Sequence, residues 1–530
     1  VDVTPKKKLW HLRRKAPTTL HGVAELVDAI LADATCKGLI LTLRSFHAGM
    51  ASATSLRAQL TRLRAAGREV IVYLPLGGDT KEIFVALAGT RILAGPETTI
   101  APLGFAVHAR YLRSALEKAG LVPQIFARGT YKSAGESLMR DSMSDAQKEQ
   151  LEALLATFYD ELVDAIAEGR HLELDRARAM IDEAPYRAKE AVRAGLVDAE
   201  AYEDEVENKL LREEPKPGAP KPVIVAAARW LAGRRGPSFV PLGEPDVVGV
   251  IRVHGPIALA GGSPMPMATD DPIIQLARAA REDPHVRAVI LHIDSPGGSA
   301  LASDRIHHEL VRLAAEKPLI ACMANVAASG GYYVAAPCHV IVAEPTTITG
   351  SIGVVAARFS AAPLLAKLGI TTSEVQRGAR SGLLDPIATL DEDEKRAIDK
   401  EIEGIYDAFV QIVADGRGKT VEQIHAVAEG RVWTGKDALT KGLVDKLGGF
   451  DLALSVARER LGPGAAKLPP KLLVPRRASI APFASQERKD RRVAQLVVEV
   501  VDALGLDRSV LLAWGRGRRE RVFTWLDLSL

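Results

Sequence analysis

The fold is decided by residues 325–333, which have the sequence NVAASGGYY. They lie inside a segment, residues 318–343, that contains no Lys, Arg, Asp or Glu and is long enough to cross a membrane. Polar residues and the glycine pair interrupt the segment, and the apolar runs 319–323 and 340–342 predict two short buried strands. We therefore expect a strand, a tight glycine turn that holds Ser329, the start of a helix and another strand.

Ser329 is the candidate reactive residue of this turn. A small hydroxyl residue followed by two glycines at the start of a buried helix would lie beside free backbone N–H groups, which is where a nucleophile is useful. The alternative interpretation is structural, because a serine before Gly330 and Gly331 is also a common helix N-cap.

Composition sets broad limits on the protein. A chain of 530 residues is too long for one ordinary domain. Its net charge of +3, from 69 basic and 66 acidic residues, is too balanced to indicate nucleic-acid binding. The three cysteines, Cys36, Cys322 and Cys338, cannot all pair within the chain and are expected to be small core residues. The sequence begins without an apolar leader, so no signal peptide or membrane anchor is visible in it.

Helical and strand patterns alternate along the chain. Helical spacing over residues 18–34 and 52–66 alternates with apolar runs at 39–43 and 69–74, which predicts a parallel sheet with right-handed crossovers. The proline-rich residues 212–222 then indicate a linker, and a new strand at 247–253 begins the second half.

The two halves of the chain are copies of each other. Residues 41–45 match 291–295 at a shift of 250, and residues 195–198 match 442–445 at a shift of 247. A third match, PETT at 96–99 with PTTI at 345–348, lies between them at a shift of 249. We predict a tandem duplication of one α/β domain. The predicted parts are a first repeat (1–211), a linker (212–245), a second repeat (246–461) and a C-terminal extension of unknown role (462–530).

The differences between the copies locate the site. Ser329 and its glycines fall opposite TKE at 80–82, so the first half lacks the glycine turn. The first half instead carries FARGTYKSAGE at 126–136, and Lys132 in this stretch has no lysine opposite it. One half keeps the serine and the other keeps the lysine, as expected for a single shared site.

Four motifs carry a resemblance to a known family. They are DSPGGS at 294–299, ASGGYY at 328–333, TGSIG at 349–353 and GTYKSA at 129–134. Together they resemble signal peptide peptidase A in its long, duplicated form, from about residue 20 to 461. The resemblance implies a serine endopeptidase on a Clp-protease-like, crotonase-type α/β fold that uses a Ser–Lys dyad. It assigns Ser329 as the nucleophile, Lys132 as the general base and Ser351 as a hydrogen-bond partner of the lysine.

The chemistry sets two further expectations. The lysine must be neutral to act as a base, so its pKa must fall by about three units from about 10.4, which burial can supply if Glu136 faces away from the amine. The oxyanion needs backbone donors. Gly330 can offer one N–H, and by similarity the turn at Gly297 and Gly298 offers another, with either glycine as the donor.

The expected substrates are extended apolar peptides such as signal-peptide remnants, cleaved through an acyl-enzyme without metal or cofactor. The resemblance also implies a homo-oligomer, a tetramer, at the periplasmic face of the bacterial inner membrane, although a soluble or cytoplasmic form fits the absence of a visible anchor. Two alternatives are a crotonase-type acyl-CoA enzyme and a catalytically silent scaffold that binds peptides. A phosphate loop at residues 416–420 is excluded because its first glycine is replaced by Val413, and Thr420 with Gln423 predicts a capping box instead.

Overall fold

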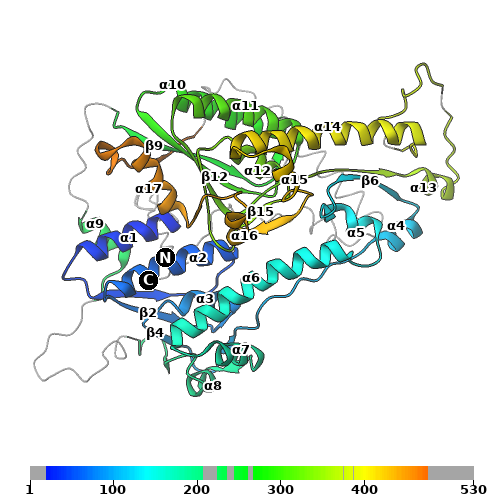
Figure 1. The fold of residues 1–530 in the computed structure, drawn as a ribbon. Coiled ribbons are helices and arrows are strands. Elements are labelled where there is room, and N and C mark those ends of the chain that lie inside the picture. The colour runs from blue at the N-terminus through cyan, green and yellow to red at the C-terminus, as the bar shows by residue number, and fades with distance from the viewer. Residues whose placement is uncertain are drawn as a thin grey trace, which may run out of the picture. The chain divides into compact units, whose positions relative to one another are not determined.

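A computed structural model describes residues 19–206, 224–234, 244–260, 267–373, 375–385 and 387–474 (Figure 1). The proline-rich linker and most of the C-terminal extension lie outside these residues. The described chain forms two compact units, the first within residues 1–105 and 159–240 and the second within residues 106–158 and 241–522. None of the described helices is long and apolar enough to cross a membrane.

The first unit is a parallel sheet with its crossover helices. Its helices are α1 (Leu20–Ala32), α2 (Met50–Ala65), α3 (Thr80–Ala86), α7 (Leu174–Asp182), α8 (Ala188–Arg193) and α9 (Ala227–Arg234). Its strands are β1 (Gly38–Thr42), β2 (Glu69–Leu74), β3 (Gly78–Asp79), β4 (Arg91–Ala94), β5 (Thr99–Ala101), β7 (Tyr186–Arg187) and β8 (Ala199–Glu200). Helix α6 (Asp145–Arg170) begins in the second unit and ends in the first.

The second unit contains the larger sheet. Its helices are α4 (Arg113–Ala119), α5 (Glu136–Met139), α10 (Asp270–Glu282), α11 (Ala300–Glu316), α12 (Gly330–Ala335), α13 (Ala362–Lys367), α14 (Glu392–Arg417), α15 (Val421–His425), α16 (Gly435–Thr440) and α17 (Phe450–Leu461). Its strands are β6 (Val122–Arg128), β9 (Val247–His254), β10 (Ile257–Ala258), β11 (Ala268–Thr269), β12 (Val286–Ser295), β13 (Leu319–Ala328), β14 (Val340–Ala343), β15 (Ile348–Gly350), β16 (Val354–Ser360), β17 (Val432–Thr434), β18 (Lys446–Leu447) and β19 (Pro470–Leu472).

The topology confirms the predicted duplication and the parallel sheets. The order β1-β2-β4-β8 in the first unit is repeated as β12-β13-β14-β18 in the second, and every pair in both series is parallel. The antiparallel pair β5–β7 likewise recurs as β15–β17. The second sheet is extended by β9 and β19, which pair in parallel beyond β12.

Both faces of the second sheet are buried, because alternate residues of its central strand enter different cores. Val289 and Leu291 of β12 pack with α10, α11, α12 and α14 on one face. Ala288 and Ile290 pack with α17 on the other face (Figure 1). Burial on both faces explains why these strands are continuous apolar runs, and why Cys322 and Cys338 are core residues as predicted.

One segment of the first sequence repeat belongs to the second compact unit. Residues 106–158 are assigned to that unit, and β6 within them pairs antiparallel with β16 over seven residue pairs from Val354–Arg128 to Ser360–Val122. The compact units therefore differ from the sequence repeats at this segment, which carries Lys132. The predicted domain boundaries themselves stay a prediction.

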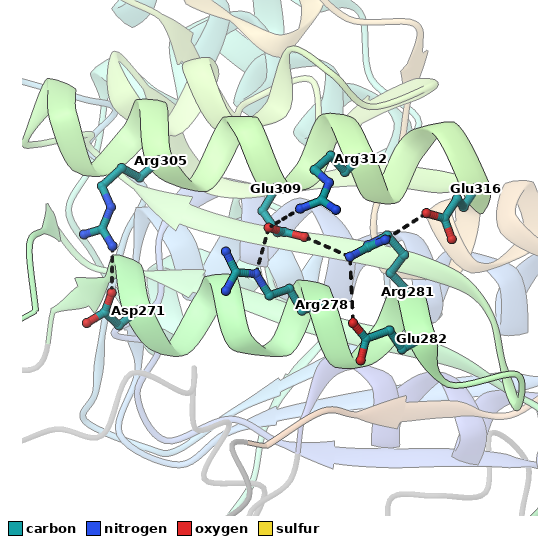
Figure 2. Close-up of polar contacts among 8 residues, drawn as sticks. All are labelled: Asp271, Arg278, Arg281, Glu282, Arg305, Glu309, Arg312 and Glu316. Carbon is teal, nitrogen blue, oxygen red and sulfur yellow. Dashed lines mark hydrogen bonds and ion pairs between the residues drawn. The ribbon is translucent and has the colours of Figure 1, made fainter.

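An ion-pair network joins α10 to α11 in the second unit (Figure 2). Its centre is Glu309, whose side chain is only 1% exposed. The Glu309 carboxylate lies 2.8 Å from Arg278 and 3.6 Å from both Arg281 and Arg312. A carboxylate this deeply buried is tolerated because three guanidinium groups surround it. The network fixes α11, the helix whose N-cap, Ser299, directly follows the Gly297–Gly298 turn.

Replacing Glu309 by Gln is expected to lower the free energy of unfolding by about 2 kcal/mol, because three arginines lose a buried partner. The matched control is Glu316→Gln, which removes a 52%-exposed partner of Arg281 and should change the free energy of unfolding by less than about 1 kcal/mol. Chemical denaturation of both variants measures the difference. Equal effects would show that the burial of Glu309 does not determine how much the network contributes to the free energy of unfolding.

In the first unit a carboxylate occupies the position that corresponds to the turn at Ser329. Glu82 on α3 is 6% exposed and accepts a hydrogen bond from the backbone N–H of Phe46. Burial, followed by the hydrogen bond shared with Asp79, raises the pKa of Glu82 from 4.5 to about 7. A buried carboxylate therefore takes the place that the glycine turn has in the second unit.

A folded-state pKa above the unfolded value means that the ionised Glu82 destabilises the fold. The free energy of unfolding should fall as pH rises from about 4.5 through 7. Glu82→Gln should consequently be near neutral at pH 5 and stabilising at pH 8, by at most about 3 kcal/mol, which corresponds to the shift at 1.36 kcal/mol per unit. Thermal unfolding at both pH values tests this, and a pH-independent effect would contradict it.

Candidate active site

Ser329 lies between β13 and α12 with backbone angles φ 54° and ψ −121°. Positive φ is strained for a serine. The conformation is held by its backbone N–H, which donates to the Gly350 carbonyl at 2.9 Å, and by its carbonyl, which accepts from Tyr332 and Tyr333 at 2.9 Å each. The Ser329 side chain makes no N-cap hydrogen bond to α12. Its hydroxyl is therefore left for other partners, unlike that of a helix-capping serine.

Lys132 reaches this hydroxyl from the segment that carries β6. Its Nζ lies 3.1 Å from Ser329 Oγ, 2.9 Å from Ser351 Oγ and 2.9 Å from the Ser351 carbonyl oxygen. A neutral amine has two N–H donors and one lone pair. Donation of both hydrogens to Ser351 leaves the lone pair directed at the Ser329 hydroxyl, the arrangement that a general base requires.

Burial of Lys132 favours the neutral amine. The residue is 9% exposed, and burial lowers its pKa from 10.5 to about 8. Glu136, whose carboxylate could have favoured the ammonium, instead accepts a 2.7 Å hydrogen bond from the Ser144 hydroxyl. The downward direction agrees with the expectation from sequence, and the shift corresponds to roughly 3 kcal/mol in favour of the neutral form.

Ser351 is held in place by its own backbone. It also has positive φ, 51°, and its N–H donates to the Arg431 carbonyl at 2.7 Å. Ser329 and Ser351 both follow directly on strands, β13 through Ala328 and β15 through Gly350, which are paired in parallel. The sheet register therefore sets the separation of the two hydroxyl groups that contact the lysine.

The Gly297–Gly298 turn lies against the start of α12. A Cβ on Gly297 would lie 2.6 Å from the Gly330 nitrogen, and a Cβ on Gly298 would lie 2.1 Å from the Ile257 carbonyl oxygen, so only glycine fits at either position. The Gly297 N–H donates to Ser295 Oγ at 3.1 Å. Within the described residues, the N–H groups of Gly298 and Gly330 have no acceptor. These two are the donors available to an oxyanion.

Residues of the second repeat fix the backbone around the lysine. The Glu429 carbonyl accepts from the Tyr131 N–H at 2.8 Å, and its carboxylate accepts from the N–H and hydroxyl of Thr130 at 2.9 and 3.1 Å. A Cβ on Gly430 would lie 2.6 Å from Lys132 Cβ. These contacts come from residues 429–430, which the sequence did not single out.

Helix α6 provides a second set of contacts to the turn that carries Lys132. Gln150, which is 4% exposed, donates through Nε2 to the Tyr131 carbonyl at 3.2 Å and to Ser133 Oγ at 2.8 Å. Its Oε1 accepts from the Val432 N–H at 3.3 Å. Arg431 lies over the Tyr131 ring, 4.6 Å from its centroid, and pairs with Glu149 at 2.6 Å. No sequence motif marked Gln150 or Arg431, because their roles depend on contacts between distant segments.

Ser329 and Lys132 lie at the wall of a cavity of about 1010 Å³ within the second unit. Most of its lining is apolar, from β16, α14 and the segment around Leu383. Ser329, Lys132 and Ser351 line one part of it together with Gly298 and Gly330. The described residues contain no group of three or more His, Cys, Asp or Glu that could hold a metal ion.

Comparisons with known proteins identify the chain. The family model described as Peptidase family S49 matches twice, at residues 62–214 and 311–462. The chain is 33% identical to "Serine protease SPPA, chloroplastic" of Arabidopsis thaliana over 81% of this chain and 64% of that protein. It is 30% identical to "Protease 4" of Salmonella typhi over 84% of this chain and 72% of that protein. ClpP1 from Listeria monocytogenes matches 38% of this chain and 94% of its own at 15% identity, with a TM-score of 0.25.

The family model and the two sequence relatives place the chain in the class of serine peptidases. Within that class it belongs to peptidase family S49, whose model is found once in each half. The resemblance to signal peptide peptidase A is thereby confirmed at the level of the family, and the double match agrees with the tandem duplication. The chain spans about two thirds of the length of the Arabidopsis relative.

The reactivity of Ser329 should rise with pH. Because the pKa of Lys132 is about 8, the neutral fraction of the amine grows about tenfold per unit below pH 8 and levels off above it. The second-order rate of labelling by a fluorophosphonate, measured from pH 6 to 10, should follow this curve. Glu136→Gln is the control and should keep the same profile, since that carboxylate does not contact the amine. A flat profile would contradict the assignment of Lys132 as the titrating group.

Proposed function

We propose that the chain is a serine endopeptidase in which Ser329 is the nucleophile and Lys132 the general base. The observation that carries the proposal is the 3.1 Å approach of Lys132 Nζ to Ser329 Oγ in a buried site, where no described residue places a charge beside the amine. Ser351 is proposed to orient the amine through its two 2.9 Å contacts. Membership of a serine peptidase family supports the same roles.

The proposed reaction follows from this geometry. Lys132 removes the hydroxyl proton as Ser329 Oγ attacks the scissile carbonyl, and the oxyanion is stabilised by the N–H groups of Gly330 and Gly298. The lysine ammonium then protonates the leaving amine, which leaves an acyl-enzyme on Ser329. Water, deprotonated by the same lysine, releases the second product. Gly298 is preferred to Gly297 as the second donor because the Gly297 N–H is already bonded to Ser295.

The cavity favours an extended apolar peptide as the substrate. Strand β16 pairs only with β6 among the described strands, so its other edge has free backbone groups, and residues Val354 to Arg358 of this strand line the cavity. An extended peptide can add to such an edge while its side chains enter apolar pockets. Remnants of signal peptides, which contain an apolar region, are the proposed natural substrates.

Assembly and location are proposals of the same kind. A homo-oligomer, a tetramer by family resemblance, would enclose the sites and restrict access to unfolded or short chains. Association with the periplasmic face of the bacterial inner membrane also rests on the resemblance alone. No feature of the described residues points to nucleic acid as a partner.

The two alternative functions have less support. A crotonase-type acyl-CoA enzyme would need acid–base carboxylates at the reacting centre, and the cavity places Lys132 and two serines there instead. A silent peptide-binding scaffold would not require a buried lysine with a lowered pKa beside a strained serine. Family membership agrees with the peptidase.

Ser329→Ala and Lys132→Ala should each reduce peptidase activity by about 10⁴-fold or more, because members of a catalytic unit act together. Lys132→Arg keeps the positive charge but cannot deprotonate, so it should be as inactive as Lys132→Ala. Cleavage of a fluorogenic apolar peptide and fluorophosphonate labelling measure the loss, and circular dichroism checks the fold. Substantial activity in folded Ser329→Ala would refute the proposal.

A further inference from the structure

One face of α14 forms the wall of the cavity away from the nucleophile. Ile398, Ile402, Ile405 and Phe409 line the cavity from this face, as expected for residues that recur every three to four positions on a helix. The Phe409 ring lies 4.9 Å from that of Tyr333, four residues after the nucleophile. The Phe409 end of the wall is therefore the end near Ser329.

Glu401 is the acidic exception in this apolar wall. It lines the cavity, is exposed, and has no hydrogen bond or ion pair within the part of the chain that the structure describes. The positions three and four residues away on α14 hold no basic side chain. Three other acids of this helix have ion-pair partners: Glu392 with Lys395, Asp393 with Arg380 and Asp399 with Arg128. The negative charge of Glu401 thus faces the cavity without a partner among the residues that the structure describes.

The two basic residues that line the cavity, Arg358 and Lys132, do not pair with the carboxylate of Glu401. Arg358 directs its guanidinium at backbone carbonyls, Leu383 and Ala388 at 2.9 Å each and Asp385. Lys132 lies at the other end with the serine. A ligand that fills the cavity would therefore meet one unpaired carboxylate beside a mostly apolar surface, which favours a cationic group there.

We propose that Glu401 is a specificity-determining residue that selects a Lys or Arg side chain of the peptide substrate, about four residues from the scissile bond. Eight residues of helix separate Glu401 from Phe409, or about 12 Å at 1.5 Å per residue. An extended peptide covers that distance in about four residues at 3.3 Å each. The inference rests on the proposed peptidase function and adds a charge requirement to its apolar substrate.

A requirement for a basic side chain next to apolar ones agrees with the proposed substrates. A signal peptide has a basic region followed directly by an apolar region. A peptide cleaved inside the apolar region, a few residues from the basic one, would place apolar side chains against α14 and a basic side chain at Glu401. The same wall would disfavour a peptide with an acidic residue at that position, because two unpaired carboxylates would lie together.

The test uses fluorogenic peptides with one apolar sequence, in which Lys, Gln or Glu is moved through each position on both sides of the scissile bond. The wild-type protein should favour Lys over Gln about threefold at one position, as expected for an exposed ion pair, mainly through KM. Glu401→Gln should remove this preference, and Glu401→Lys should reverse it in favour of Glu. Added salt, at about 0.5 M, should weaken the wild-type preference.

Glu403→Gln is the matched control, because Glu403 is exposed on the same helix and does not line the cavity. It should keep the wild-type preference. No preference in the wild type, or an equal loss in Glu401→Gln and Glu403→Gln, would overturn the inference, since the second result would indicate general charge attraction.

A binding measurement separates this inference from the proposed function. Fluorescence anisotropy of the same peptides with Ser329→Ala reports affinity without turnover, and the Lys-over-Gln preference should appear there as about a threefold difference in Kd. Charge-selective binding with no cleavage by the wild type would refute the peptidase and support the role of Glu401. Cleavage and binding without charge selectivity would refute only the role of Glu401.

Discussion

The site depends on the burial of one amine. Lys132 contacts backbone and hydroxyl groups and has no carboxylate partner in the described part of the chain, so the folded protein favours its neutral form, with a pKa lowered to about 8. This burial requires the residue to be held without an ion pair, by packing and by contacts to its backbone. Glu429 and Gln150 supply those contacts on either side of the turn. Their polar groups bind the backbone of the lysine segment and leave the amine to the two serines.

Backbone strain accompanies this arrangement. Ser329 and Ser351 both adopt positive φ directly after paired strands, which is unfavourable by roughly 1–3 kcal/mol each. The parallel sheet imposes both conformations, because β13 and β15 end side by side and the chain must turn at each end. The turns bring the two hydroxyl groups to the same amine. The stable sheet thus maintains a local geometry that isolated turns would not keep.

The two copies of the duplicated domain differ in what they contribute to the second unit. In the first copy Glu82 lies at the position that corresponds to the turn at Ser329 and accepts the Phe46 N–H. The first copy instead contributes β6 and the lysine turn to the second unit through the β6–β16 pair. The asymmetry between the aligned halves therefore has a structural counterpart, since the first copy lacks the glycine turn and supplies the lysine segment to the second unit.

The sequence by itself determined the parallel α/β class, the duplication, and the two residues that meet at the site. Apolar runs, glycine pairs and the loss of a motif in one copy are local features that can be recognised in the sequence alone. Only the tertiary structure decided that residues 106–158 belong with the second unit. It also decided that, among the described residues, the Gly297 N–H is bonded while that of Gly298 has no acceptor, and that Glu401 faces the cavity unpaired. These facts depend on contacts between residues far apart in the chain, and no local pattern of residue types encodes which distant groups will share one hydrogen bond or one cavity.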